Sequence, residues 1–118
     1  MEYLLLIYGN EADVNNLSEA ELGAIYQEFG GFTQSIVESK NFVAGQRLED
    51  VATATTVRVR NGKRLVTDGP FAETREQLGG FYIIHAKDLD EALAIAERIP
   101  SARWGSIEVR PIAPPPPR

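Results

Sequence analysis

The stretch Asp68–Ala96, DGPFAETREQLGGFYIIHAKDLDEALAIA, decides how the chain is organised. It begins with the turn Asp68–Gly69–Pro70, continues through a polar loop to Gly79–Gly80, and then holds an apolar run and a helical pattern. Proline removes a backbone donor and restricts the residue before it to extended geometry. The turn therefore predicts that the strand leading into it ends there.

The second half of this stretch predicts a strand followed by a helix. Phe81–Ala86 (FYIIHA) is apolar on both faces, as in a strand that is covered on both sides. Asp88 and Glu91 have the spacing of a capping box, and Pro100 ends the helix that they open. The expected buried face of this helix consists of Leu89, Ala92, Leu93, Ala96 and Ile99.

The N-terminal third repeats this order of strand and helix. Glu2–Tyr8 (EYLLLIY) is a second apolar run, and Asn10–Leu17 is expected to be a polar loop. Ser18 and Glu21 match a capping box, and the helix that they open ends at Lys40–Asn41. Apolar side chains at three- and four-residue spacing form its predicted packing face: Leu22, Ile25, Phe29, Phe32 and Ile36.

Four further strands are expected, two of them in a hairpin. Phe42–Leu48, Ala52–Arg60 and Ser106–Ile112 have extended patterns. Asn61–Gly62 is a strong hairpin signal, because both residues tolerate the positive φ of a type I′ turn. Lys63–Thr67 is therefore the returning strand of the hairpin.

The order of elements predicts an α+β domain of the ferredoxin-like split βαβ type with an inserted β-hairpin. Residues 1–112 are expected to form a single domain, and residues 113–118 a proline-rich, disordered tail. Two helices cover only one face of such a sheet. Because apolar side chains remain on the other face, we expect a second copy of the chain to cover it in a homodimer.

Composition and charge narrow the classes of function. The 118 residues carry a formal net charge of −5 and no cysteine, which excludes disulfides, thiolate metal sites and a cysteine nucleophile. We interpret the basic cluster Arg58, Arg60, Lys63 and Arg64 as a solvated hairpin tip rather than a nucleic-acid contact. Leu4–Tyr8 is too short to cross a membrane or to form a signal-peptide core. We expect a cytoplasmic protein that binds neither nucleic acid nor membranes.

Several segments resemble one known family. DGPFAETREQLGGFY, together with EYLLLIYG, TATTVRVRNGK, FYIIHAKDLDEALAIAERIP and IEVRPI, is similar to the YCII-related family. Within that family the chain resembles the branch called DGPF-domain proteins, after Asp68–Gly69–Pro70–Phe71. The resemblance covers nearly the whole chain except the proline tail. It implies a ferredoxin-like α+β subunit that pairs sheet to sheet as a dimeric α+β barrel.

The resemblance also implies two kinds of activity. Some YCII-related proteins carry a His–Asp pair in a cleft, which implies acid/base catalysis. This chain departs from that pattern, because its predicted first helix has no histidine and its only histidine is His85. Proteins of the DGPF branch often accompany extracytoplasmic-function sigma factors, which implies a regulatory role.

Asp68 and His85 are the candidate catalytic residues. A carboxylate held at a strand end could act as a general base, whereas the structural alternative is an Asx turn in which Asp68 accepts backbone hydrogen bonds. His85 could transfer a proton if it paired with a carboxylate. Between Ile84 and Ala86, however, it is more typical of a hydrogen-bonded structural histidine. A single histidine without cysteine is a poor metal site, so no metal is expected.

The polar loop after Asp68 holds the first candidate ligand-binding residues. Glu73 and Arg75 could line a cleft with Asp68, and the guanidinium of Arg75 could bind a ligand carboxylate. The alternative is a short solvated helical turn that is capped by Thr74 and Gln77.

Tyr8, Tyr82, Glu108 and Arg110 form the second candidate group. The runs that carry them can lie side by side in a ferredoxin-like sheet, with Glu108 and Arg110 on the face opposite the helices. There a Glu–Arg pair would either bind a ligand or set the register of the dimer. No phosphate-binding or dinucleotide motif occurs, so no cofactor is expected.

Two hypotheses of function follow from the sequence. The first is a homodimer that binds a small polar or aromatic molecule near Asp68, Glu73 and Arg110, with cofactor-independent acid/base chemistry as an extension. The second is a non-catalytic regulatory or interaction module that associates with a sigma factor. One scaffold hosts many functions, so the fold alone does not separate them.

Overall fold

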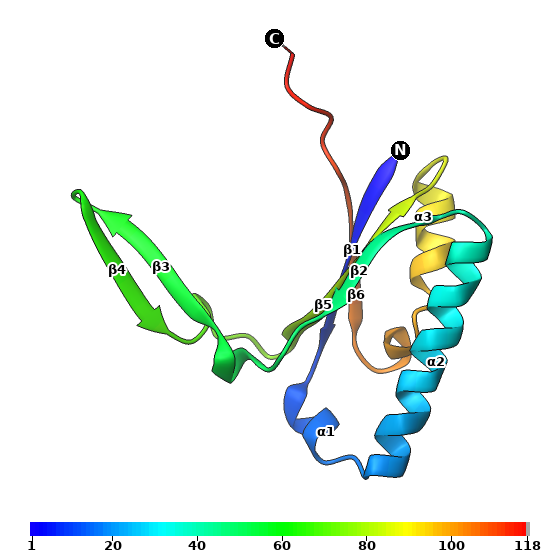
Figure 1. Ribbon diagram of the computed structural model, residues 1–118, viewed down its shortest axis with the longest axis horizontal. Coiled ribbons are helices and arrows are strands. Elements are labelled where there is room, and N and C mark those ends of the chain that lie inside the picture. The colour runs from blue at the N-terminus through cyan, green and yellow to red at the C-terminus, as the bar shows by residue number, and fades with distance from the viewer. Residues whose placement is uncertain (118) are drawn as a thin grey trace.

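A computed structural model describes residues 1–117 and shows a body with a projecting arm (Figure 1). The body is built on a four-stranded antiparallel sheet in the order β2-β5-β1-β6. Its strands are β1 (Glu2–Gly9), β2 (Phe42–Arg47), β5 (Gln77–His85) and β6 (Ser106–Pro111). This strand order, with a helix after β1 and another after β5, is that of the ferredoxin-like fold. The predicted α+β class is confirmed, and the dimeric barrel stays a prediction.

Helices cover one face of this sheet. The long helix α2 (Glu19–Glu38) and the shorter α3 (Leu89–Ala96) lie together on that face, and a short helix, α1 (Glu11–Asn15), precedes α2. The capping box predicted for α2 is present, because Ser18 Oγ accepts from the Glu21 N–H and Glu21 Oε1 accepts from the Ser18 N–H. Two 3₁₀ turns, η1 (Val51–Thr53) and η2 (Pro100–Arg103), complete the helical elements.

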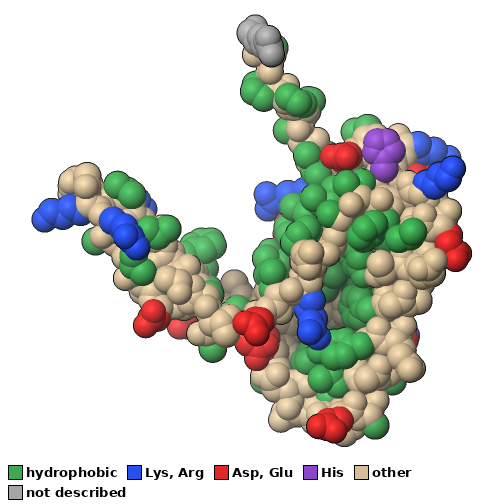
Figure 2. Space-filling model, viewed as in Figure 1, with side chains coloured by type: hydrophobic (Ala, Val, Ile, Leu, Met, Phe, Trp, Pro, Cys, Tyr) green, Lys and Arg blue, Asp and Glu red, His purple; other side chains and the backbone are tan. Residues whose placement is uncertain are grey.

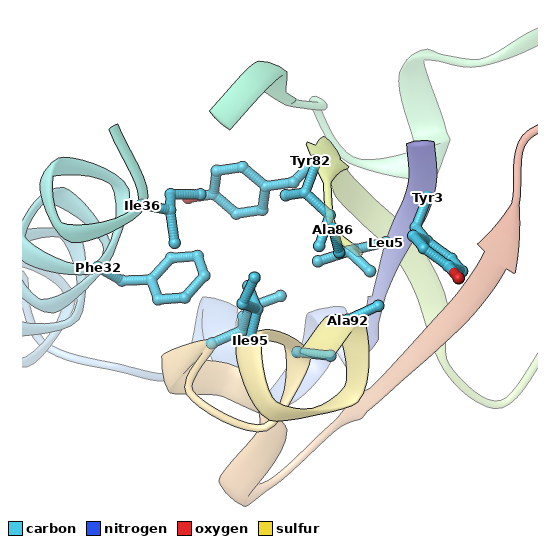
Figure 3. Packing of buried hydrophobic residues seen from close by; sticks show 11 residues of the cluster. Tyr3, Leu5, Phe32, Ile36, Tyr82, Ala86, Ala92 and Ile95 are labelled. Carbon is cyan, nitrogen blue, oxygen red and sulfur yellow. The ribbon is translucent and has the colours of Figure 1, made fainter. Parts of the chain in front are cut away.

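The core lies between the sheet and the two helices (Figure 3). Leu5 of β1 and Ile84 of β5 are fully buried and face Ile36 of α2. Ala92 and Ile95 of α3 close the other side of the cluster. Each buried aliphatic side chain contributes roughly 1.5–3 kcal/mol relative to an exposed one, so this cluster holds the helices on the sheet.

The arm is the predicted hairpin, and it forms a separate two-stranded sheet. Its strands are β3 (Thr55–Arg60) and β4 (Lys63–Asp68), with Arg60 opposite Lys63. Asn61 and Gly62 both have positive φ, 53° and 72°, which confirms the two-residue type I′ turn. The arm lies on the side of the body sheet opposite α2 and α3 (Figure 1). The Cα radius of gyration is therefore 16.5 Å, against about 13.5 Å for a compact chain of this length.

Several element boundaries differ from the predictions. β5 begins at Gln77 rather than Phe81 and runs through the glycine pair. A Cβ on Gly80 would lie 2.9 Å from the Gln46 carbonyl oxygen, so this glycine lets β2 approach β5 closely. Helix α1 forms within the predicted loop, because the Asn10 side chain caps the N–H groups of Ala12 and Asp13. The strand predicted over residues 52–60 begins only at Thr55, after the η1 turn.

The predicted face of α3 was also partly wrong. Leu89 and Leu93 are exposed, and Ile95 is buried in their place. The predicted and the observed faces share Ala92, Ala96 and the following Ile99, so the helical periodicity fits both. The packing of α3 on the sheet decides which face is buried. Only half of the second capping box forms. Asp88 Oδ1 accepts from the Glu91 backbone N–H, whereas Glu91 Oε1 accepts from the backbone N–H of Lys87 and not from that of Asp88.

Beyond β6, residues 113–117 have no helix or strand and are exposed. The predicted disordered tail spans 113–118, and Arg118 lies outside the described residues, so disorder stays a prediction. Among residues 1–117, no helix combines the length and the apolar character needed to traverse a lipid bilayer.

Candidate functional site

A groove of about 740 Å³ lies between the N-terminal half of helix α2 and the sheet. Phe32 and Ile36, in the C-terminal half of α2, are buried in the core, whereas Ile25 and Phe29 are only half-buried. The apolar face of the N-terminal half thus lines the groove, and Phe29 also packs against the edge of the core. The opposite wall is the sheet, with Ile7, Gly80 and Tyr82 among its residues. A groove of this size suits a small molecule.

Tyr82 stands at the junction of the groove and the core. Its hydroxyl lies 2.6 Å from Thr33 Oγ1, which joins β5 to α2. Its ring packs edge-on against Phe32 at 5.3 Å and against Phe42 at 6.4 Å between centroids. Burial raises the pKa of Tyr82 above its ordinary value, and the hydrogen bond with Thr33 opposes that shift. A Cβ on Gly45 would lie 2.7 Å from this ring, so a glycine of β2 makes room for the tyrosine.

The mouth of the groove carries both signs of charge. The guanidinium of Arg47 lies 4.7 Å from the centre of the Tyr26 ring, a cation–π contact. Three carboxylates line the same mouth: Glu11, Glu49 and Asp50. Glu11 Oε2 accepts from the Val51 N–H at 2.9 Å, and Asp50 Oδ2 accepts from Asn15 Nδ2 at 3.2 Å. Two of the three carboxylates therefore also hold the base of the arm and α1 in place.

Ser101 and Trp104 form the end of the groove next to η2. Ser101 is buried, and among residues 1–117 its Oγ has no hydrogen-bond partner. A buried unpaired hydroxyl of this kind costs about 1–3 kcal/mol. Trp104 is half-exposed and is the single tryptophan of the chain, so its fluorescence reports on this site.

We expect the folded protein to lose stability at alkaline pH because of Tyr82. Its pKa is raised in the folded state, so its contribution is complete below the unfolded value of about 10 and is lost as pH rises through the folded value. Tyr82→Phe, which keeps the ring, should flatten the decline in the free energy of unfolding above about pH 10. Urea unfolding at several pH values measures it. Tyr26→Phe, at an exposed tyrosine, should keep the wild-type decline, and equal profiles for the two variants would contradict the expectation.

Glu108 and Arg110 lie on the outer face of the body sheet, the face opposite the helices. Leu6 pairs with Glu108 and Leu4 with Arg110, whereas the intervening Leu5 is buried towards the helices. Glu108 Oε2 accepts from Arg110 Nε at 2.7 Å, and this hydrogen bond raises the pKa of the Arg110 guanidinium. Both side chains are well exposed in the single chain. An exposed pair of this kind contributes little to stability.

The DGPF loop and the groove are separate in one chain. Asp68, Glu73 and Arg75 are exposed, and none of them lines the groove. Residues 69–76 form bends without a helix, with Gln77 Nε2 donating to the Thr74 carbonyl at 2.8 Å. Within residues 1–117 the Asp68 carboxylate accepts no hydrogen bond, so the Asx turn is not seen. Of the predicted site residues, only Tyr8 and Tyr82 line the groove.

His85 is exposed at the end of β5 (Figure 2, purple). Its backbone N–H donates to the Asn41 carbonyl at 2.7 Å, and its carbonyl accepts from Asn41 Nδ2 at 2.8 Å. The hydrogen bonds thus hold its backbone and not its imidazole. The described part of the chain contains no group of three His, Cys, Asp or Glu side chains arranged to hold a metal ion.

Fold and groove together define the chain as a small ferredoxin-like α+β domain with an apolar cleft beside its long helix. The YCII-related domain family matches residues 1–115, and the chain belongs to this family. It is also 38% identical over 115 residues to a protein of Rhizobium meliloti (strain 1021) that is described as uncharacterised. That alignment covers 96% of this chain and 93% of the relative. The family resemblance seen in the sequence is therefore confirmed, while the DGPF branch stays a prediction.

Proposed function

We propose that this protein is a homodimer that binds a small, largely apolar molecule in the groove between α2 and the sheet. The observation that carries the proposal is the groove itself. Its volume of about 740 Å³ lies within the range of small-molecule sites, and apolar side chains such as Ile25, Phe29 and Trp104 dominate its walls.

The polar groups of the groove favour an uncharged ligand. Among residues 1–117, Arg47 is the only basic residue that lines the groove, and three carboxylates line it as well, so a strongly anionic molecule gains little there. The hydroxyls of Tyr82 and Thr33, which are hydrogen-bonded to each other, are polar groups beside the apolar wall. A flat aromatic molecule with one hydroxyl or carbonyl group fits this chemistry. No catalytic step is proposed, because neither Asp68 nor His85 lines the groove.

A titration with Nile red, an uncharged dye that emits strongly in apolar surroundings, tests the groove. We expect saturable binding with quenching of Trp104, because that residue lines the site. Ile25→Gln should weaken binding about tenfold, since it removes apolar contact from the wall. Val37→Gln makes a similar change at an exposed position on the same helix and should leave binding unchanged. Equal affinities of the two variants would mean that the dye binds elsewhere, and would refute the groove as its binding site.

The outer face of the sheet supports the homodimer. Cross-strand pairing places Leu4 beside Ile83 and Leu6 beside Phe81, so an apolar centre runs across β1 and β5. The Glu108–Arg110 pair borders this centre on β6. No segment among residues 1–117 covers the face (Figure 1). Two such faces packed against each other would bury the apolar centre and enclose the Glu108–Arg110 pair at its border.

Leu6→Lys is the test of the sheet-to-sheet dimer. In one chain the new ammonium lies next to Glu108 across the strand pair, so the subunit should still fold. In the dimer the same charge would be buried in the apolar centre, which is strongly unfavourable. Light scattering at micromolar concentration should show twice the subunit mass for the wild type and a folded monomer for the variant. A monomeric wild type would refute the dimer.

The alternative is an interaction module that associates with an extracytoplasmic-function sigma factor. The observation that favours an interaction role is the arm, whose apolar side chains are exposed in the single chain. Co-purification of a sigma factor with the tagged protein from its own cells would support this alternative. Saturable ligand binding without such a partner would favour the first proposal.

A further inference from the structure

The arm has an apolar face that its own chain leaves exposed. Val57 lies opposite Val66 and Val59 opposite Arg64, so the three valines share one face of the hairpin. Their side chains are 61%, 51% and 64% exposed for Val57, Val66 and Val59. A two-stranded hairpin is at best marginally stable in water, and it needs packing against another surface. This surface must come from outside the chain, because the arm projects away from the body (Figure 1).

The direction of the arm points to the second copy that covers the sheet. The arm extends on the side of the outer face, where the partner of the proposed dimer would lie. Stacked sheets are about 10 Å apart, and a six-residue strand spans about 20 Å. The arm is therefore long enough to pass the partner's sheet and to reach the level of its helices.

The distribution of charge favours this contact. The arm strands, TTVRVR and KRLVTD, carry four basic residues and one acidic residue. The helices EADVN, EAELGAIYQEFGGFTQSIVE and LDEALAIA carry eight acidic residues and no basic residue. Figure 2 shows the Lys and Arg side chains at the far end of the arm. The arm cannot lie on its own helices, because the sheet stands between them.

We propose that each arm docks on the second subunit, with its valine face against the partner and its basic tip on the partner's acidic helical layer. The inference deepens the proposed function and rests on its sheet-paired homodimer. The DGPF loop joins the arm to β5, and its Phe71 is 78% exposed in one chain. Docking brings this loop, with Asp68, Glu73 and Arg75, to the partner. These loop residues then lie at the interface between the two subunits and not in the groove of their own chain.

Mixing two charge variants, one of the arm and one of the helices, tests docking between subunits. The arm variant carries Arg60→Glu and Arg64→Glu. The helix variant carries four Lys substitutions at exposed acidic positions that form no cap or ion pair within residues 1–117: Asp13, Glu19, Glu38 and Asp90. In the homodimer of the arm variant, an arm with net charge −1 meets an acidic helical layer with net charge −8, and the two repel. In the homodimer of the helix variant, the helical layer has net charge zero and no longer attracts the basic arm. In the mixed dimer, the basic arm of the helix variant meets the intact acidic layer of the arm variant, and the repulsion is removed.

We therefore expect native mass spectrometry of the mixture to show mixed dimers above the share given by random pairing. The control variant, Lys40→Glu with Lys87→Glu, changes the net charge equally but outside the arm, and it should pair with the helix variant much less selectively. The selectivity should decline between 0.1 M and 1 M salt, as the Debye length falls from about 10 Å to about 3 Å. Equal pairing of the arm and control variants would overturn the proposal.

A second variant tests the apolar contact without charge changes. Threonine is β-branched like valine and keeps the strand preference, so Val57→Thr, Val59→Thr and Val66→Thr together should leave the hairpin formed. We expect the dimer to dissociate at concentrations at least tenfold higher than for the wild type. An unchanged dissociation constant would refute docking by the valine face. If the wild type dimerises and Leu6→Lys does not, but both arm tests fail, the sheet pairing stands and the arm docking falls.

Discussion

Leu5→Ala is expected to lower the free energy of unfolding by about 2–5 kcal/mol. Leu5 lies in β1 between Tyr82 of β5 and Val109 of β6, with no exposed surface, and its side chain faces the helices. Its removal opens a cavity in the cluster that holds α2 and α3 on the sheet, and no neighbour can fill the space without moving the sheet. Urea unfolding followed by far-UV circular dichroism measures the change.

Leu93→Ala is the matched control for this variant. Leu93 lies on α3 and is 46% exposed, although the sequence pattern placed it on the buried face. Alanine is also the better helix former, so the change should stay within about 1 kcal/mol. Equal losses from Leu5→Ala and Leu93→Ala would mean that α3 packs through the face predicted from the sequence.

Gly105→Ala should be the most damaging glycine substitution. A Cβ at this position would lie 2.3 Å from the Tyr8 carbonyl oxygen and 3.3 Å from that of Ser101. Both are backbone atoms, so the turn between η2 and β6 must move away from β1. Overpacking of this kind costs about 1–3 kcal/mol. Because the turn also carries Ser101 and Trp104 next to the groove, Nile red affinity should fall together with the melting temperature.

Gly23→Ala provides a control of opposite sign. Gly23 lies within α2, and nothing comes within 4 Å of the position of an added Cβ. Replacing a helical glycine by alanine should stabilise by about 0.5–1 kcal/mol. Unchanged stability of Gly105→Ala would contradict the close approach of the turn to β1, and a loss of stability in Gly23→Ala would contradict the open space beside Gly23.

The elements with local chemical signals were predicted well. The capping box of Ser18 and Glu21, and the turn at Asn61–Gly62, both appear as expected. Each depends on interactions within a few residues, which the sequence specifies without the rest of the fold. The polar helix α1 was missed, because its five residues have no apolar periodicity and only the Asn10 cap marks them.

The groove was harder to predict than the elements around it. Leu22, Ile25 and Phe29 share the helical face of Phe32 and Ile36, so the spacing treats all five as core. Burial of only the last two depends on the angle at which α2 crosses the sheet. No sequence pattern pointed to Thr33 or Arg47 as groove residues, because a single threonine and a single arginine resemble ordinary surface residues.

The sequence alone determined most of the strands and helices, several of their ends, and that the helices leave one face of the sheet uncovered. These properties follow from backbone geometry, caps and the alternation of apolar residues, all of which act over short distances along the chain. Only the tertiary structure decided that α2 leaves a groove and that the arm points away from the helices. Such choices depend on packing between residues far apart in the sequence, and no local pattern encodes them.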